Sequence, residues 1–146
     1  EKLKLQEPYP DEADIELREK VILASNRCKD IQKEIDHLVN SLVLSSLFRA
    51  ELDLGADAKP CHSGTVMGMK DSRIYVMLDS PRIEIKVYTE DLEKYSGEKF
   101  SYRFHVLEEI GAQNKPLRLR AGDEIKIKVA GFDEYGKWRF MVEGID

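Results

Sequence analysis

The sequence is poor in the residues that build metal centres. It has two cysteines, Cys28 and Cys61, and three histidines without metal-ligand spacing in 146 residues. No Cys-x-x-Cys pair is present, and Cys61 and His62, as neighbours in a strand, would point to opposite faces. Because a closed zinc site needs four converging ligands, we expect no metal site in this chain. Few cysteines and the lack of a signal peptide favour a reducing compartment, and hence the cytoplasm.

Membrane-spanning and catalytic patterns are missing as well. No apolar run reaches the roughly 18 residues that a membrane span needs, so no membrane partner is expected. The sequence suggests no Ser-His-Asp or Cys-His arrangement and no phosphate-cradling glycine loop. The acidic residues at 11–14 are typical of the first turn of a helix, and those at 30–36 are expected on the solvent-exposed side of the second helix. We therefore expect no catalytic residues in this chain.

An excess of positive charge is missing too. The chain has 23 Lys and Arg against 28 Asp and Glu, a net charge of −5. Residues 1–58 hold 8 basic and 13 acidic side chains, whereas residues 59–146 hold 15 of each. Proteins that bind nucleic acid over a broad surface are usually basic overall. Any RNA site here must therefore be a local patch with modest, salt-sensitive affinity.

Residues 1–60 are interpreted as a helical segment with a linker at its end. Two prolines exclude a helix interior in residues 1–10, and Asp11 then begins a first helix with acidic residues in its first turn. Ser25-Asn26 is interpreted as a break and as the N-cap of a second helix. The second helix carries an amphipathic stripe of Cys28, Ile31, Ile35, Leu38 and Leu42. The stripe favours packing on a neighbouring domain over a coiled coil, because it covers few heptads.

From residue 61 onward the apolar period changes from 3.6 to 2, which predicts β-strands. The predicted strands are a meander of three and a final hairpin, at residues 62–70, 74–78, 83–87, 125–129 and 138–142. Between them, residues 89–123 are expected to be irregular, with a short helical turn at 90–95. The predicted core comprises Val66, Ile74, Val76, Leu78, Ile83, Ile85, Val87, Ile125, Ile127, Val129, Trp138, Phe140 and Val142. The expected fold is α+β: a helical segment of two helices at 1–60, then a five-stranded antiparallel OB-fold β-barrel at 61–146.

Four short motifs in the second half match the strands of one known type of barrel. Residues 64–68 have the Gly-x-Val-x-Gly form of its first strand, and residues 73–78, Arg-Ile-Tyr-Val-Met-Leu, stand where Phe-Gly-x-Phe-Val-x-Leu is usual. Residues 86–88 match the Leu-Val-His stretch, and residues 121–125 match the strand beginning Gly-Asp. In this order and spacing, the motifs resemble the S-one type RNA-binding domain.

The whole chain is similar to the C-terminal region of the ribonuclease II / ribonuclease R family of exoribonucleases. That family has a longer segment between its third and fourth strands, with a Tyr-x-Phe piece and a Gly-Asp end. Here residues 102–104 read Tyr-Arg-Phe, and residues 117–123 end in Ala-Gly-Asp. Upstream, Tyr-Pro-Asp-Glu at residues 9–12 and the helix at 26–48 resemble the family's exit from its catalytic domain.

The resemblance implies the RNA-binding part of a hydrolytic 3′→5′ exoribonuclease that degrades RNA. The catalytic carboxylates and their Mg²⁺ would lie in an upstream domain that this chain does not contain, on which the helices would dock. The second strand departs from the family pattern, with Ser72 at the family's first aromatic position and Arg73 at its glycine. In the third strand, Ile85 stands at a family glycine and Tyr88 at the family histidine.

The candidate RNA-binding residues are Tyr75, Tyr88, Lys86, Arg73 and Lys70. By alternation, the two tyrosines point away from the core on neighbouring strands, where bases could stack on their rings. The three cations would meet the phosphates. The alternative is that these side chains merely cover a solvated sheet face, where tyrosine is common.

Two further questions stay open at the level of the sequence. The basic run at residues 114–120 either contacts phosphates or is solvated surface. The whole chain is either an RNA-capturing module for single-stranded RNA, or a protein-interaction or dimerisation module built on an OB barrel with little RNA affinity. The lost aromatic at Ser72 and the neutral barrel motivate the second reading, and the oligomeric state is open.

Overall fold

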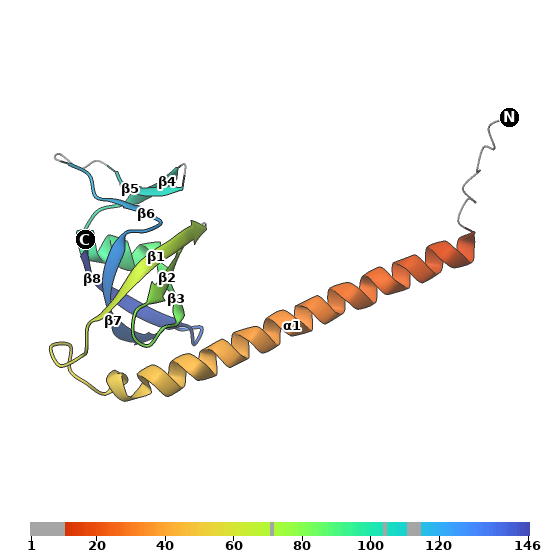
Figure 1. Cartoon of the computed structure of the whole chain (residues 1–146), viewed down its shortest axis with the longest axis horizontal. Coiled ribbons are helices and arrows are strands. Elements are labelled where there is room, and N and C mark those ends of the chain that lie inside the picture. The colour runs from red at the N-terminus through yellow and green to blue at the C-terminus, as the bar shows by residue number, and fades with distance from the viewer. Residues whose placement is uncertain (1–10, 71, 104, 111–114) are drawn as a thin grey trace. The chain divides into compact units, whose positions relative to one another are not determined.

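The structure, a computed structural model, describes residues 11–70, 72–103, 105–110 and 115–146. Its first element is helix α1, Glu12–Leu52, which Figure 1 shows as one unbroken helix. Asp11 is the N-cap, because its Oδ1 accepts a hydrogen bond of 2.8 Å from the N–H of Asp14. The chain divides into two compact units, Glu1–Leu42 and Val43–Asp146, so the last turns of α1 belong with the strands.

The predicted break at Ser25-Asn26 is wrong, since α1 runs through both residues. The described residues do form two helices, but the second is the short α2, Thr89–Ser96, where a helical turn was expected. Serine and asparagine in a helix interior cost at most about 0.7 kcal/mol each relative to alanine, and no glycine or proline lies in α1. Two mildly unfavourable residues therefore do not interrupt a helix of 41 residues.

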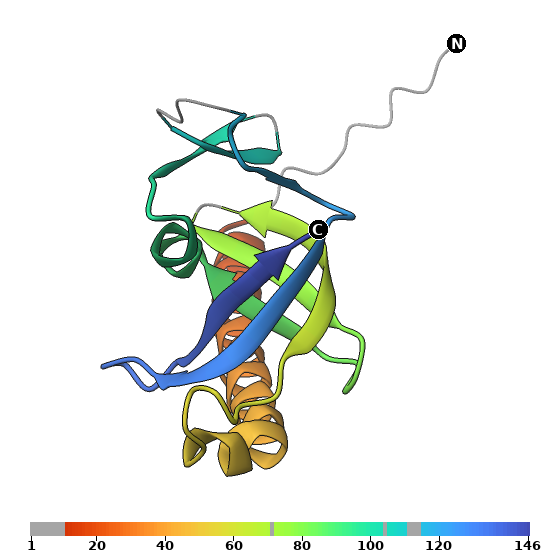
Figure 2. The same cartoon turned by 90° about the vertical axis from the view of Figure 1, so that its left-hand side faces the viewer.

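An antiparallel sheet of five strands, in the order β3-β2-β1-β7-β8, confirms the predicted meander and hairpin. Its strands are β1 His62–Lys70, β2 Arg73–Leu78, β3 Glu84–Tyr88, β7 Glu124–Phe132 and β8 Trp138–Ile145. Among the described residues, no ladder joins the edge strands β3 and β8, so the hydrogen-bonded sheet does not close. Instead, β8 packs against α2, the green helix of Figure 2, and against β3.

The expectation of an irregular segment after α2 is wrong. A second antiparallel sheet, in the order β4-β5-β6, lies over the end of β1 in Figures 1 and 2. Its strands are β4 Phe100–Arg103, β5 Val106–Glu109 and β6 Arg118–Arg120. They are three or four residues long, and the buried anchors are the paired Leu107 and Leu119. Strands of this length show too few alternating residues for hydrophobic periodicity to predict them from the sequence.

The hydrophobic core lies between the inner face of the five-stranded sheet and the elements that cover it. All but one of the predicted core residues are buried, and Ile83 is partly buried against the same cluster. The sequence analysis missed Leu44, Phe48, Leu92, Leu107 and Leu119. Phe48 packs edge-on against Phe140, with ring centroids 5.9 Å apart, and thereby fixes the C-terminal end of α1 to β8.

Two side-chain contacts fix the segment between α1 and β1, which was predicted as a linker. Lys59 donates a hydrogen bond of 2.8 Å to the carbonyl oxygen of Val129 in β7. Nε2 of His62 lies 3.0 Å from each carboxylate oxygen of Glu51 at the end of α1. No helix in the described part of the chain is both long and apolar enough to cross a membrane.

Candidate nucleic-acid interface

The structure brings all five candidate residues together on three neighbouring strands. In the β2–β3 ladder, Arg73 pairs with Tyr88 and Tyr75 pairs with Lys86. In the β1–β2 ladder, Lys70 pairs with Arg73. The residues between them on β2 and β3 are buried in the core, so the candidates lie on the opposite side of the sheet. We call this set (Lys70, Arg73, Tyr75, Lys86 and Tyr88) the outer face.

A β-bulge in β1 decides which residues of that strand join the outer face. Val66 pairs with Val76 and Gly68 pairs with Tyr75, so Met67 is the extra residue of the bulge. Directly paired residues point to the same side of a sheet. Gly68 therefore shares the outer side with Tyr75. Met69 returns to the core, and Lys70 lies outside next to Arg73.

The cations of the outer face are not neutralised by ion pairs within the described residues. Lys70, Arg73 and Lys86 form no ion pair there, whereas Lys94, Lys99, Arg118, Lys126, Lys128 and Arg139 each pair with a carboxylate. One acidic residue, Glu84, precedes Lys86 by two positions on β3 and so shares its side. The outer face keeps a net positive charge in a chain that is acidic overall.

The two tyrosine rings are not equivalent. The guanidinium carbon of Arg139 lies 4.5 Å from the centroid of the Tyr88 ring, so a cation covers one side of this ring. Arg139 is held there by the buried carboxylate of Asp91, whose hydrogen bonds raise the pKa of Arg139. Among the described residues, no aromatic or cationic group stacks on Tyr75. Both tyrosines are half-buried, and Tyr75 is the one that keeps its ring free of a stacked group within these ranges.

The sequence analysis did not include the β4–β5 hairpin in the site. Tyr102 Oη donates a hydrogen bond of 3.2 Å to the carbonyl oxygen of Met69, the residue before Lys70. The same oxygen lies 3.2 Å from Nδ1 of His105. The exposed side chain of His105 therefore lies near the end of β1 that carries Lys70. The Tyr-Arg-Phe piece was a signal for this hairpin, but Phe104 lies outside the described residues.

The structure describes residues 115–120 of the basic run at 114–120. Asn114 lies outside the described residues. Arg118 is engaged by Glu108, with Nη2 2.8 Å from Oε1, whereas Lys115 and Arg120 are exposed. Arg118 and Arg120 flank the buried Leu119 on β6 and so share its exposed side, with Arg118 engaged by Glu108.

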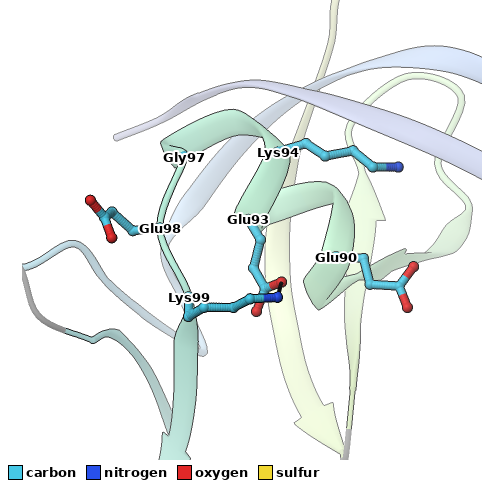
Figure 3. Close-up of a pocket in the computed structure, with 6 residues that line it drawn as sticks. All are labelled: Glu90, Glu93, Lys94, Gly97, Glu98 and Lys99. Carbon is cyan, nitrogen blue, oxygen red and sulfur yellow. Dashed lines mark hydrogen bonds and ion pairs between the residues drawn. The ribbon is translucent and has the colours of Figure 1, made fainter.

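A shallow pocket lies along α2 and the residues that follow it, and none of the five residues of the outer face lines it. Figure 3 shows Glu93 and Lys99 pointing toward each other, while Glu98 and Lys94 point away. The Lys99 ammonium lies 2.9 Å from Oε2 of Glu93, and this hydrogen bond lowers the pKa of Glu93 and raises that of Lys99. Two of the charged groups that line the pocket thus neutralise each other.

No three His, Cys, Asp or Glu side chains within the described ranges gather as a metal site would require. Cys28 and Cys61 are free and exposed. No protein-family model matches the chain, and no curated protein matches its sequence.

Proposed function

We propose that this chain is an RNA-binding module that captures single-stranded RNA on the outer face. The observation that carries the proposal is the pairing of a ring with a cation in two successive rows, Tyr75 with Lys86 and Tyr88 with Arg73. Rings give bases a surface on which to stack, and cations meet phosphates, without dependence on base identity. The affinity should be modest, because the outer face carries a small number of cations, namely Lys70, Arg73 and Lys86.

We further propose that the five-stranded sheet is an OB-type barrel closed by packing. The strand order β3-β2-β1-β7-β8, with α2 inserted after β3, supports this reading. So does the packing of β8 against both β3 and α2. OB folds are partly open barrels that commonly bind oligonucleotides over their second and third strands, where the outer face lies.

In the larger protein, we propose a role in RNA degradation by a 3′→5′ exoribonuclease of the ribonuclease II / ribonuclease R family. The sequence motifs support this proposal. The chemistry, with Mg²⁺, would belong to an upstream domain outside this chain, and the outer face would lead RNA toward it. Exposed apolar side chains of α1, among them Leu17, Val21 and Leu38, would be covered by that domain.

The test is a fluorescence-anisotropy titration of the chain with a labelled single-stranded oligo-RNA at low and at moderate salt. We expect binding that weakens as salt rises, and a loss of more than about tenfold when Tyr75→Ala is combined with Tyr88→Ala. The same double variant should weaken RNA binding by the full-length enzyme. Unchanged affinity in the double variant would contradict the proposal.

A matched control is available on the β7–β8 hairpin. Tyr135 is exposed and has the ammonium of Lys137 5.7 Å from its ring centroid, so it is also an aromatic next to a cation. The variant Tyr135→Ala should bind RNA as the unsubstituted chain does. An equal loss in this variant would indicate non-specific binding rather than a site.

A second candidate function is protein interaction or dimerisation through α1. The observation that favours it is the exposed apolar stripe of α1, in which Ile31, Ile35 and Leu42 are 47%, 53% and 70% exposed. This function requires self-association or a protein partner, without salt-dependent RNA binding. Light scattering that gives a monomeric mass would count against self-association.

A further inference from the structure

The two glycines of β1 differ in what their missing side chain would meet. A Cβ added to Gly64 would lie 2.7 Å from the carbonyl oxygen of Met77 and 2.8 Å from Cγ1 of Val76. Packing against β2 therefore requires glycine at position 64. A Cβ added to Gly68 would meet no atom within 4 Å, and the backbone of Gly68 is not left-handed. Neither packing nor backbone geometry requires glycine at position 68.

A glycine inside a strand weakens the strand, because it loses more conformational entropy on folding and offers no side chain to pack. Gly68 nevertheless stands inside β1, directly opposite Tyr75 and on the same outer side. Its missing side chain leaves open space beside the tyrosine ring. On the other side of the ring, β3 presents Lys86 in the same row. Across the three strands, this row therefore consists of the open space at Gly68, the ring of Tyr75 and the ammonium group of Lys86.

We propose that this open space is a subsite for one nucleobase of single-stranded RNA, in which the base stacks on Tyr75 over the backbone of Gly68. The inference rests on the proposed function and adds a residue and a position to it. In the part of the chain that the structure describes, no aromatic or cationic group stacks on Tyr75, whereas Arg139 covers one side of the Tyr88 ring. Lys86 lies within reach of the phosphate attached to such a base. A side chain at position 68 would occupy this open space without disturbing the core.

The experiment compares Gly68→Ala and Gly68→Val with the unsubstituted 146-residue chain. Thermal unfolding is followed by circular dichroism, and binding of a labelled single-stranded oligo-RNA is followed by anisotropy at low salt. We expect unfolding temperatures that are unchanged or raised, because alanine and valine restrict the unfolded chain and valine favours strands. We expect roughly tenfold weaker RNA binding for valine, and a smaller loss for alanine.

The matched control is Gly144→Ala in β8. A Cβ there would meet only the Lys126 side chain, at 3.7 Å, which is an ordinary contact, and position 144 is not on the outer face. This variant should keep both stability and RNA affinity. If adding a methyl group to any strand glycine weakened RNA binding, Gly144→Ala would also show a loss of RNA affinity.

The outcomes separate the subsite from the wider function. If the unsubstituted chain binds RNA and Gly68→Val binds equally well, the subsite is wrong and the RNA-binding function stands. If the unsubstituted chain does not bind, both are overturned. If Gly68→Val unfolds as readily as Gly64→Ala, position 68 is structural and the subsite is overturned. Adding Tyr75→Ala to Gly68→Val should cause little further loss, since both remove the same stacked base.

Discussion

The guanidinium of Arg139 and the carboxylate of Asp91 are joined by two hydrogen bonds across 48 residues of sequence. Nε donates to Oδ2 at 2.9 Å and Nη2 donates to Oδ1 at 2.7 Å. Asp91 is only 6% exposed, although it carries a charge. The pair fastens α2 to β8 and holds the cation that covers the Tyr88 ring. It therefore links the packing of the sheet edges to the candidate site.

Removing Arg139 should destabilise the fold strongly. Arg139→Ala leaves the buried Asp91 carboxylate with only the exposed Lys94 ammonium, 3.3 Å from Oδ1, and we expect a loss of about 3 kcal/mol in the free energy of unfolding. Denaturant unfolding followed by circular dichroism measures this loss. The control is Arg118→Ala, which breaks an exposed pair with Glu108 and should cost less than about 1 kcal/mol. Equal losses in the two variants would show that burial of Asp91 does not matter.

The two tyrosines should contribute unequally to RNA binding. Tyr75→Ala should weaken affinity for single-stranded RNA about tenfold, because the side chain gives a base an open ring on which to stack. Tyr88→Ala should weaken it by about threefold or less, because Arg139 already occupies one side of that ring. Anisotropy titrations of the two single variants at the same salt concentration give the comparison. A larger loss of RNA affinity in Tyr88→Ala than in Tyr75→Ala would show that Tyr88, not Tyr75, is the main stacking residue.

The compact unit should fold without the first 42 residues but not without α1 altogether. A fragment of residues 43–146 keeps Leu44 and Phe48, which are buried in the core. Its thermal unfolding midpoint should match that of the whole chain. A fragment of residues 61–146 loses both side chains and should unfold at a much lower temperature or fail to fold. Similar stability of the two fragments would contradict the role of the helix end.

A single substitution tests the same contact without truncation. Phe48→Ala should cost about 3–5 kcal/mol, because it leaves a cavity among the rings of His62, Trp138 and Phe140. Leu47→Ala, one residue away and 38% exposed, should change stability by about 1 kcal/mol at most. Denaturant midpoints of the two variants provide the measurement.

The ion pair between Glu93 and Lys99 should make stability depend on acid pH. The folded-state pKa of Glu93 is below its usual value of 4.5, mainly through its hydrogen bond with Lys99. A lowered pKa contributes stability above the unfolded-state pKa and loses it as the pH falls through the folded-state pKa. Glu93→Gln should therefore lower the unfolding temperature by about 1–3 °C at pH 7, and the difference should shrink below pH 4.5 and vanish once the pH is below the lowered folded-state pKa of Glu93.

The control for this pH dependence is Glu134→Gln, on the exposed β7–β8 hairpin. Among the described residues, Glu134 forms no ion pair, so the substitution should leave the unfolding temperature unchanged at each pH. A constant difference between Glu93→Gln and the unsubstituted chain from pH 7 to pH 3 would rule out the charge as the cause. A difference that shrinks in high salt at pH 7 would support it.

The local part of this fold could be predicted from the sequence. Alternation along β2 and β3 placed Ile74 and Val87 in the core, and the same alternation placed Tyr75 and Lys86 together outside. Alternation is a property of the strand itself, so it requires no knowledge of distant contacts. The continuity of α1 through Ser25 was missed, because a weak helix former resembles a helix end in the sequence.

Contacts between distant segments could not be predicted. The cover of Arg139 on Tyr88 and the hydrogen bond from Tyr102 to Met69 join residues on elements that are not adjacent in sequence. Each depends on how α2 and the second sheet pack, and no spacing rule encodes this. The burial of Leu44 and Phe48 was missed for a related reason, since the apolar stripe that precedes them on α1, with Ile31, Ile35 and Leu42, is exposed.

The bulge in β1 also determines how this chain must be aligned with others. Val66 and Gly68 pair with consecutive residues of β2, and Met67 between them has no partner on that strand. The nine residues of β1 therefore cover the length that eight residues of a regular strand would cover. A protein without this residue could present an equivalent face with a first strand one residue shorter. A sequence alignment of the two proteins without a gap at Met67 would then match Lys70 with a core residue of the other protein. The similarity between their outer faces would not be visible in that alignment.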